Sequence, residues 1–203
     1  MNAPFKNPWI LAFLVGAVLV TLTVPFFRHV PPAPAMTGSL PAWRLQDEAG
    51  RPLGSAELSG HVVVMAFVSQ GCRSACERVG AGLASLSRRF DEVKAPVDIV
   101  VVVIDSDPGA ITPASRAAWA SRVMPGASRL HVAGGPRQDT CPLVLAAFGA
   151  RGKAAGCERL HALADQARLV LVDGQGHLRG DYGSDGLGLD ETFHRALAVL
   201  ENR

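Results

Sequence analysis

The order of apolar and polar positions predicts alternating strands and helices along most of the chain. Two nearly continuous apolar runs, His61–Ser69 ("HVVVMAFVS") and Val97–Asp105 ("VDIVVVVID"), are rich in β-branched residues. Such runs are typical of strands that are buried on both faces of a sheet. Between them, Cys76–Phe90 places apolar residues at intervals of three and four, which predicts a helix.

The same alternation continues toward the C-terminus. The pattern first predicts a helix after the N-cap Thr112 and a short strand over Ser128–Gly134. A helix within Pro136–Gly152 follows, with Pro142 near or before its start. The chain then ends with a hairpin of strands Arg168–Val172 and His177–Tyr182 and a closing helix over Leu189–Arg203, with Asp190 near its cap. A short strand and two turns are expected between residues 42 and 60. This order favours an α/β or α+β layered fold with parallel crossover units.

The N-terminal segment differs from the rest, because residues 8–27 contain no charged side chain. Twenty helical residues span roughly 30 Å, the hydrocarbon thickness of a bilayer, so we predict a transmembrane anchor. The chain then divides into a short tail (1–7), the anchor (8–27), a Pro-rich tether (28–41) and one folded domain (42–203). The alternative is a cleaved signal peptide, since "APA" at Ala33–Ala35 resembles a cleavage site.

Charge and cysteine content narrow the class of protein. The chain has 203 residues, a net charge of +2 and no run of Lys or Arg, so nothing indicates a nucleic-acid partner. Its four cysteines permit two disulfides. Disulfides persist outside the cytosol, and a large domain after a short tail and an anchor usually lies outside. We therefore expect a single-pass protein of the inner (cytoplasmic) membrane with a periplasmic domain.

Cys72 and Cys76, with three residues between them, follow the first buried strand at the point where a helix begins. The carboxyl ends of central strands are where sites form in open sheets. A thiol at a helix N-terminus is a good redox nucleophile, while two thiolates on one helix face bind soft ions such as Cu(I) or Zn. Packing as two small apolar residues is the third interpretation. Both active roles require the sulfurs to be accessible.

Several segments occur in the order found in Sco/SenC proteins, behind an anchor and a tether. They are "LPAWRLQDEAGRPL", "GHVVVMAFVSQGCRSAC", "DIVVVVIDSDPGAITP" and "LVLVDGQGHLRGDYG". Over about Leu40–Arg203 the chain resembles these thioredoxin-like, membrane-tethered copper proteins of cytochrome c oxidase assembly. The resemblance implies a central mixed sheet flanked by helices, and copper, Cu(I) or Cu(II), bound by Cys72 and Cys76. It also implies a histidine shortly before the late strand as the third ligand.

The chain departs from the family pattern at that histidine. Asp165 occupies the expected position, and the nearest histidine is His161, four residues earlier. A carboxylate is a poor ligand for Cu(I) but an acceptable one for Cu(II). His161 is therefore the candidate third ligand and Asp165 a weaker substitute, unless His161 is a surface residue without a role. Glu77 stands where the family usually has proline, and its charge opposes thiolate formation. The other histidines, which their positions explain adequately, are His29, His61, His131, His177 and His194.

The second cysteine pair is a further departure. Cys141 and Cys157 bracket fifteen residues, "PLVLAAFGARGKAAG". We predict a structural disulfide between them, which would stabilise the fold by ~3 kcal/mol in the chain-entropy account. Two alternatives remain, a resolving pair for Cys72 and Cys76 or two free thiols.

The leading hypothesis is a membrane-anchored copper chaperone or thiol–disulfide protein for the copper centre of a cytochrome c oxidase. Cys72 and Cys76 would be its redox pair and its copper ligands. Its partner would be the terminal oxidase subunit that carries the copper centre, or a donor of copper or thiols. The alternatives are a metal-free extracytoplasmic thiol–disulfide oxidoreductase and a tethered thioredoxin-fold binding module with a permanent bridge.

Overall fold

The computed structural model describes residues 8–27, 32–69, 74–104, 112–125 and 127–202. The chain forms two compact units, Met1–Pro31 and Pro32–Arg203. In the first unit the described element is the helix α1 (Pro8–Phe27). Among the described residues, no helix combines the length and the apolar character that crossing a bilayer requires. The anchor over residues 8–27 therefore stays a prediction.

The second unit is built on a six-stranded mixed sheet with the strand order β1-β8-β7-β4-β5-β6. Its strands are β1 (Gly38–Ser39), β4 (Val62–Ser69), β5 (Val97–Ile104), β6 (Leu130–Ala133), β7 (Arg168–Val172) and β8 (His177–Gly183). β4, β5 and β6 are parallel, whereas β7 is antiparallel to both β4 and β8. A separate hairpin consists of β2 (Arg44–Gln46) and β3 (Pro52–Gly54). The central mixed sheet implied by the resemblance is confirmed.

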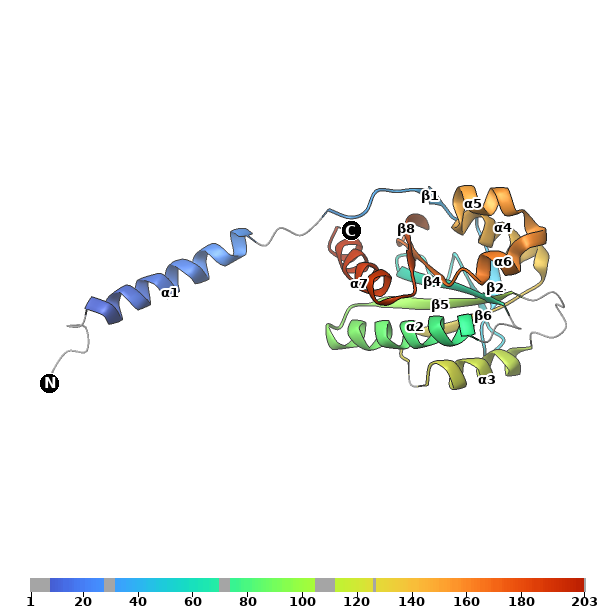
Figure 1. Ribbon diagram of the computed structural model, residues 1–203, viewed down its shortest axis with the longest axis horizontal. Helices are drawn as coiled ribbons and strands as arrows, with labels where there is room; N and C mark the ends of the chain where they lie inside the picture. Colours follow the sequence, from blue (N-terminus) through green and yellow to red (C-terminus); the bar gives the residue numbers. More distant parts are fainter. Residues whose placement is uncertain (1–7, 28–31, 70–73, 105–111, 126, 203) are drawn as a thin grey trace. The chain divides into compact units, whose positions relative to one another are not determined.

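Helices cover both faces of this sheet (Figure 1). On one face lie α2 (Ser74–Glu92), α3 (Pro113–Val123) and α7 (Gly186–Glu201). On the other lie α4 (Arg137–Ala147), α5 (Gly149–Ala155), the 3-10 helix η2 (Cys157–Arg159) and α6 (Leu160–Ala164). Alternate residues of β4 pack into the two cores, since successive side chains of a strand point to opposite faces. The continuous apolar runs of β4 and β5 follow from this double burial.

The helix predicted within Pro136–Gly152 is divided in two by Gly149. This residue has a φ of +55°, a left-handed conformation that favours glycine and ends the regular path of α4. Pro142 lies inside α4 rather than near or before its start. The prediction of one helix there was therefore wrong in its continuity, and two short helices replace it.

The closing helix begins earlier than predicted. Asp185 is its N-cap, and its Oδ1 accepts a hydrogen bond from the backbone N–H of Gly188 at 2.8 Å. Asp190, which was predicted to lie near the cap, is inside α7 and pairs with Arg89 at 2.8 Å. The apolar periodicity alone could not show that the helix starts in the polar stretch before Leu189.

Candidate functional site

The carboxyl end of β4 and the first turn of α2 form the candidate site. Cys76 lies in this first turn and is disulfide-bonded. Its Sγ lies 3.7 Å from the carbonyl oxygen of Ser69, the last residue of β4. A helix N-terminus stabilises nearby negative charge, whereas burial of a sulfur in apolar surroundings opposes it. Cys72, the other predicted site cysteine, lies outside the described residues.

The expected accessibility of Cys76 is not found, because its side chain is only 4% exposed. Cys76 is the first member of the apolar stripe of α2 that packs on the sheet and continues through Val79 and Leu83. The spacing of three and four residues from Cys76 to these positions was visible in the sequence. An incoming thiol or ion therefore reaches this sulfur only where the site opens locally.

Asp165 is brought to the same strand end from the other face of the sheet. It is the C-cap residue of α6 and is exposed. Its Oδ1 accepts a hydrogen bond from the Ser69 hydroxyl at 3.1 Å. Ser69 thus contacts Asp165 through its side chain and Cys76 through its backbone carbonyl. The weaker of the two predicted third ligands is the one that shares a contact residue with Cys76.

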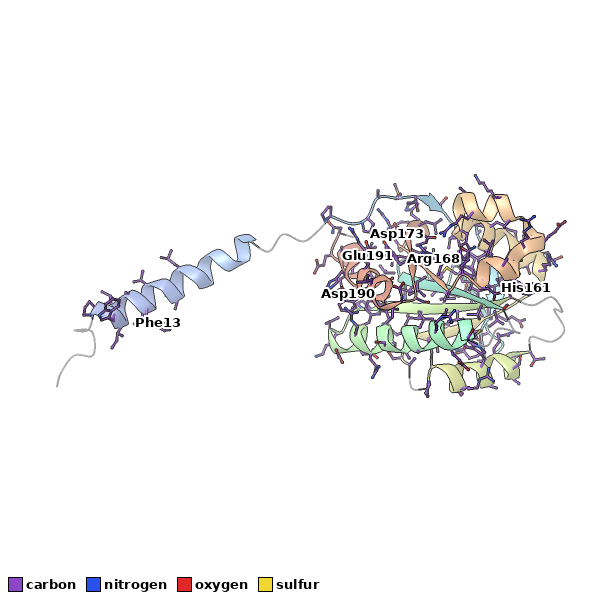
Figure 2. The ribbon with its side chains drawn as sticks, viewed as in Figure 1. Phe13, His161, Arg168, Asp173, Asp190 and Glu191 are labelled. Carbon is purple, nitrogen blue, oxygen red and sulfur yellow. A yellow bond between two sulfur atoms is a disulfide. The ribbon has the colours of Figure 1, made fainter. Side chains whose placement is uncertain are left out.

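His161 lies on α6, one turn before Asp165, at the end of the second unit where α2 begins (Figure 2). It is half-buried, and its carbonyl oxygen accepts the backbone N–H of Asp165 at 2.9 Å. In the part of the chain that the structure describes, no group of three or more His, Cys, Asp or Glu side chains is arranged to hold a metal ion. The role of His161 as a third copper ligand stays a prediction.

Packing and a covalent bond fix the place of α6. Leu160 and Leu163 are buried in the core against the sheet. A disulfide joins Cys141 of α4 to Cys157 of η2, directly before α6, with the two Cα atoms 5.5 Å apart. Without these two constraints, a helix of five residues would not form stably. The disulfide therefore helps to hold α6, and with it Asp165, in place.

Ser69 is the site residue that sequence reasoning missed. It is the polar end of an otherwise apolar strand and is 7% exposed. A buried hydroxyl at the end of β4 needs a hydrogen-bond partner, because burying it unpaired costs free energy. That requirement was a signal in the sequence, but it did not name Asp165, which is 96 residues away.

A groove of about 590 Å³ adjoins the site between α2 and the start of α7. Arg168 is part of its lining, and its Nη2 donates to the carbonyl oxygen and to Oδ1 of Asp181, both at 2.9 Å. Burial lowers the pKa of Arg168 and the nearby Arg151 lowers it further, while Asp185 opposes both effects. Arg168 is thus tied to Asp181 through Nη2, whereas its buried Nε has no hydrogen-bond partner among the described residues.

Three of the other histidines lie beside carboxylates away from the site. His61 contacts Asp98 at 2.5 Å, His177 contacts Asp173 at 3.2 Å, and His194 lies 3.7 Å from Asp190. His131 is in β6, and His29 lies outside the described residues.

Comparison with known proteins gave matches among solved structures. No protein-family model matches the chain, and no curated protein matches it. A Sco1/SenC family lipoprotein from Bacillus anthracis superposes with a TM-score of 0.65 at 18% identity, covering 82% of this chain and 99% of its own. BsSco, described as a member of the Sco family of cytochrome c oxidase assembly proteins, gives 0.66 at 16%, covering 83% and 97%.

Bradyrhizobium japonicum ScoI with copper bound gives a TM-score of 0.56 at 14% identity, covering 79% of this chain and 98% of its own. At sequence identities this low, the superpositions establish the fold alone. The chain has the thioredoxin-like α/β fold of the Sco/SenC proteins.

Proposed function

We propose that this chain is a Sco/SenC-type protein that binds copper through Cys72 and Cys76 and serves the assembly of the copper centre of a cytochrome c oxidase. The observation that carries the proposal is the position of the Cys76 sulfur, at the junction of β4 and α2. Solved neighbours of this fold include one with copper bound and one described as an oxidase assembly protein.

The available donors fit Cu(I) better than Cu(II). Thiolate sulfur is a soft donor that matches Cu(I), whereas the carboxylate of Asp165 is a hard donor that matches Cu(II). Cu(I) is stable with two sulfur ligands, so binding through Cys72 and Cys76 needs neither Asp165 nor His161. Because thiolates are the ligating species and Cys76 is disulfide-bonded, copper uptake requires prior reduction.

A Cu(I) titration of the full chain tests the proposal. The protein is purified in mild detergent and reduced without oxygen. Alkylation of a separate aliquot confirms that Cys72 and Cys76 are free thiols while the Cys141–Cys157 disulfide stays closed, and the unalkylated remainder is used for the titration. Cu(I) is then titrated against a chromogenic Cu(I) chelator. We expect one tightly bound Cu(I) per chain. Cys76→Ser abolishes this binding because one of the two sulfurs is gone.

Three variants separate the ligands. His161→Ala and Asp165→Asn leave the Cu(I) affinity unchanged if the two sulfurs suffice. The double variant Cys141→Ser/Cys157→Ser keeps the same stoichiometry, which excludes the second cysteine pair as the copper site. The proposal is wrong if the reduced chain binds no Cu(I), or if Cys76→Ser binds it equally well. Reduction of protein disulfides without copper binding would instead identify a metal-free thiol–disulfide oxidoreductase.

We also propose that residues 8–27 anchor the protein in the inner membrane and that its domain is periplasmic. Support comes from the uncharged sequence of α1 and from the Cys141–Cys157 disulfide, a bond that persists in oxidising compartments. The anchor predicts that the full chain stays with membranes after alkaline extraction. The location predicts that a membrane-impermeant protease degrades the domain once the outer membrane is opened. Release by alkali, or full protection from protease, would refute the respective prediction.

A further inference from the structure

The Cys141–Cys157 disulfide has one buried and one exposed end. Cys141 is 2% exposed and lies in α4 against the sheet, whereas Cys157 is exposed on η2. A disulfide is opened by attack of a thiolate on an accessible sulfur. An external thiol therefore approaches the bridge from the side of Cys157, and Cys141 is the leaving group.

The segment Gly149–Arg159, which carries Cys157, has little packing of its own. In α5 the buried residue is Gly152, and η2 has none. Besides the disulfide, the polar contacts of this segment include an ion pair of Arg151 with Asp181 and a hydrogen bond from Arg137 Nη2 to the Cys157 carbonyl at 2.5 Å. Exposed ion pairs contribute about 0–1 kcal/mol, so the disulfide is the strongest link between this segment and α4.

The weakly packed segment leads directly to the candidate site. α6 starts at Leu160, right after η2, and ends at Asp165, whose carboxylate is held by the Ser69 hydroxyl. Ser69 in turn contacts the Cys76 sulfur. The short helix α6 therefore connects η2 to the contacts around Cys76, so a change in the mobility of η2 can alter those contacts.

We propose that Cys141 and Cys157 form a second thiol–disulfide site, which an external dithiol opens and which sets the reactivity of the Cys76 disulfide through α6. With the bridge closed, the carboxylate of Asp165 is held at the strand end and repels an incoming thiolate. With the bridge open, the segment before α6 loosens and Asp165 leaves Ser69. The Cys76 disulfide then reacts faster. The inference rests on the proposed role of Cys76, but not on copper binding.

The redox step balances with a dithiol as the reductant. Its thiolate attacks Cys157 Sγ, a mixed disulfide forms, and the Cys141–Cys157 bond breaks. Cys141 leaves as a thiolate and takes up a proton. The second thiol of the reductant loses its proton and attacks the mixed disulfide, which releases Cys157 as a thiolate that is then protonated. The chain gains two electrons and two protons, and the reductant becomes a cyclic disulfide.

The first test is stepwise reduction of the full chain with dithiothreitol, followed by isotope-coded alkylation that reports each cysteine separately by mass spectrometry. We expect the Cys141–Cys157 bridge to open under native conditions. Opening it should raise amide hydrogen exchange in residues 149–165 by about tenfold or more, while β4 and β5 stay protected. A bridge that opens only when denaturant unfolds the sheet would overturn the proposal.

The second test compares the rate at which dithiothreitol reduces the Cys76 disulfide in wild type and in Cys141→Ser/Cys157→Ser. We expect the rate to be about threefold or more higher in the double variant, because a nearby negative charge has moved away. Equal rates would overturn the proposal. If the double variant does not fold, the same rate is measured in wild type whose opened bridge has been alkylated.

Ser69→Ala is the control for the coupling path. Without the hydroxyl, Asp165 has lost its tie to the strand end, so the Cys76 disulfide should react fast whether or not the bridge is closed. A bridge-dependent rate that persists in Ser69→Ala would refute this path. Because the readout is a thiol rate, a chain that binds no copper but shows the rate difference loses the proposed function and keeps this inference.

Discussion

Asp173 at the β7–β8 turn provides a stability prediction whose size follows from its contacts. Its Oδ1 accepts the backbone N–H groups of Gln175 and His177, both at 2.9 Å. Its Oδ2 accepts Arg179 Nε at 2.8 Å. Arg179 also donates to the carbonyl oxygen of Pro34 at 3.0 Å, which ties the start of the domain to β8. Since Asp173 is 4% exposed, few water molecules could replace these bonds.

Asp173→Asn keeps the shape of the side chain but removes its charge. A hydrogen bond to a charged group contributes about 1.5–3 kcal/mol, and such contributions are not additive within one cluster. The variant also turns an amide NH₂ toward donors that require an acceptor. We therefore expect the free energy of unfolding to fall by about 3 kcal/mol. For a domain of this size, that loss lowers Tm by roughly 6–12 °C.

The effect must depend on pH in a defined direction. Burial of Asp173 raises its pKa, but the hydrogen bonds from the His177 backbone, Arg179 and the Gln175 backbone outweigh burial and hold the pKa below its ordinary value of 3.8. A lowered pKa stabilises the folded state above the unfolded pKa, near 3.9, and this stabilisation is lost as the pH falls through the folded pKa. The difference in stability between wild type and Asp173→Asn should therefore be present at neutral pH and shrink toward pH 3.

Chemical denaturation across this pH range measures the difference directly. Asp190→Asn is the matched control, because Asp190 is 58% exposed and its pair with Arg89 lies at the surface (Figure 2). Such pairs contribute about 0–1 kcal/mol. The reasoning is refuted if Asp173→Asn destabilises no more than Asp190→Asn, or if its effect is the same at pH 3 as at pH 7.

Two further substitutions test the elements around the site. Asp185→Ala should lower the free energy of unfolding by about 1 kcal/mol because it removes the N-cap of α7. Asp190→Ala should lower it less, because Asp190 is not the cap. Thermal denaturation of the two variants measures the difference. Leu163→Ala should cost about 2–5 kcal/mol because Leu163 is 2% exposed in the core. Since α6 loses its anchor, amide exchange at Asp165 should also rise, and an unchanged exchange rate would contradict the role given to this packing.

The central strands and α2 could be predicted from sequence because their signals are local. β4 was expected over His61–Ser69 and is found at Val62–Ser69, and β5 agrees within one residue. A strand that is covered by helices on both faces has no polar alternation, so its apolar run is unmistakable. The stripe of α2 was equally clear, because one face of the helix packs on the sheet and the other faces solvent.

The region between β6 and β7 was less predictable because backbone conformation decides it. Gly149 and Gly156 both have positive φ values, +55° and +64°, and they divide residues 137–164 into α4, α5 and the η2–α6 turn. Glycine permits such conformations but does not require them. Pro142 was expected to mark a helix start, yet it is accommodated inside α4. The sequence therefore shows where this region can bend, but not where it does.

The candidate site was predictable on one side only. The position of Cys76 after a buried strand was visible, whereas the contact between Ser69 and Asp165 joins residues 96 positions apart. That contact depends on how α6 packs across the sheet, which no local pattern encodes. The family pattern placed its histidine at the position of Asp165, but a position in the sequence does not show that Asp165 contacts Ser69.

The identity of residue 165 decides what kind of copper site the proposed function can have. An imidazole there would add a third bond to the ion, whereas the carboxylate of Asp165 is a weak donor for Cu(I) and is already engaged by Ser69. Cu(I) held by two sulfurs has fewer bonds to break on transfer than Cu(I) held by two sulfurs and a nitrogen. A carboxylate beside the site also disfavours the thiolates that precede binding. In a copper protein of the proposed kind, both effects would shift the balance from retaining copper toward passing it on.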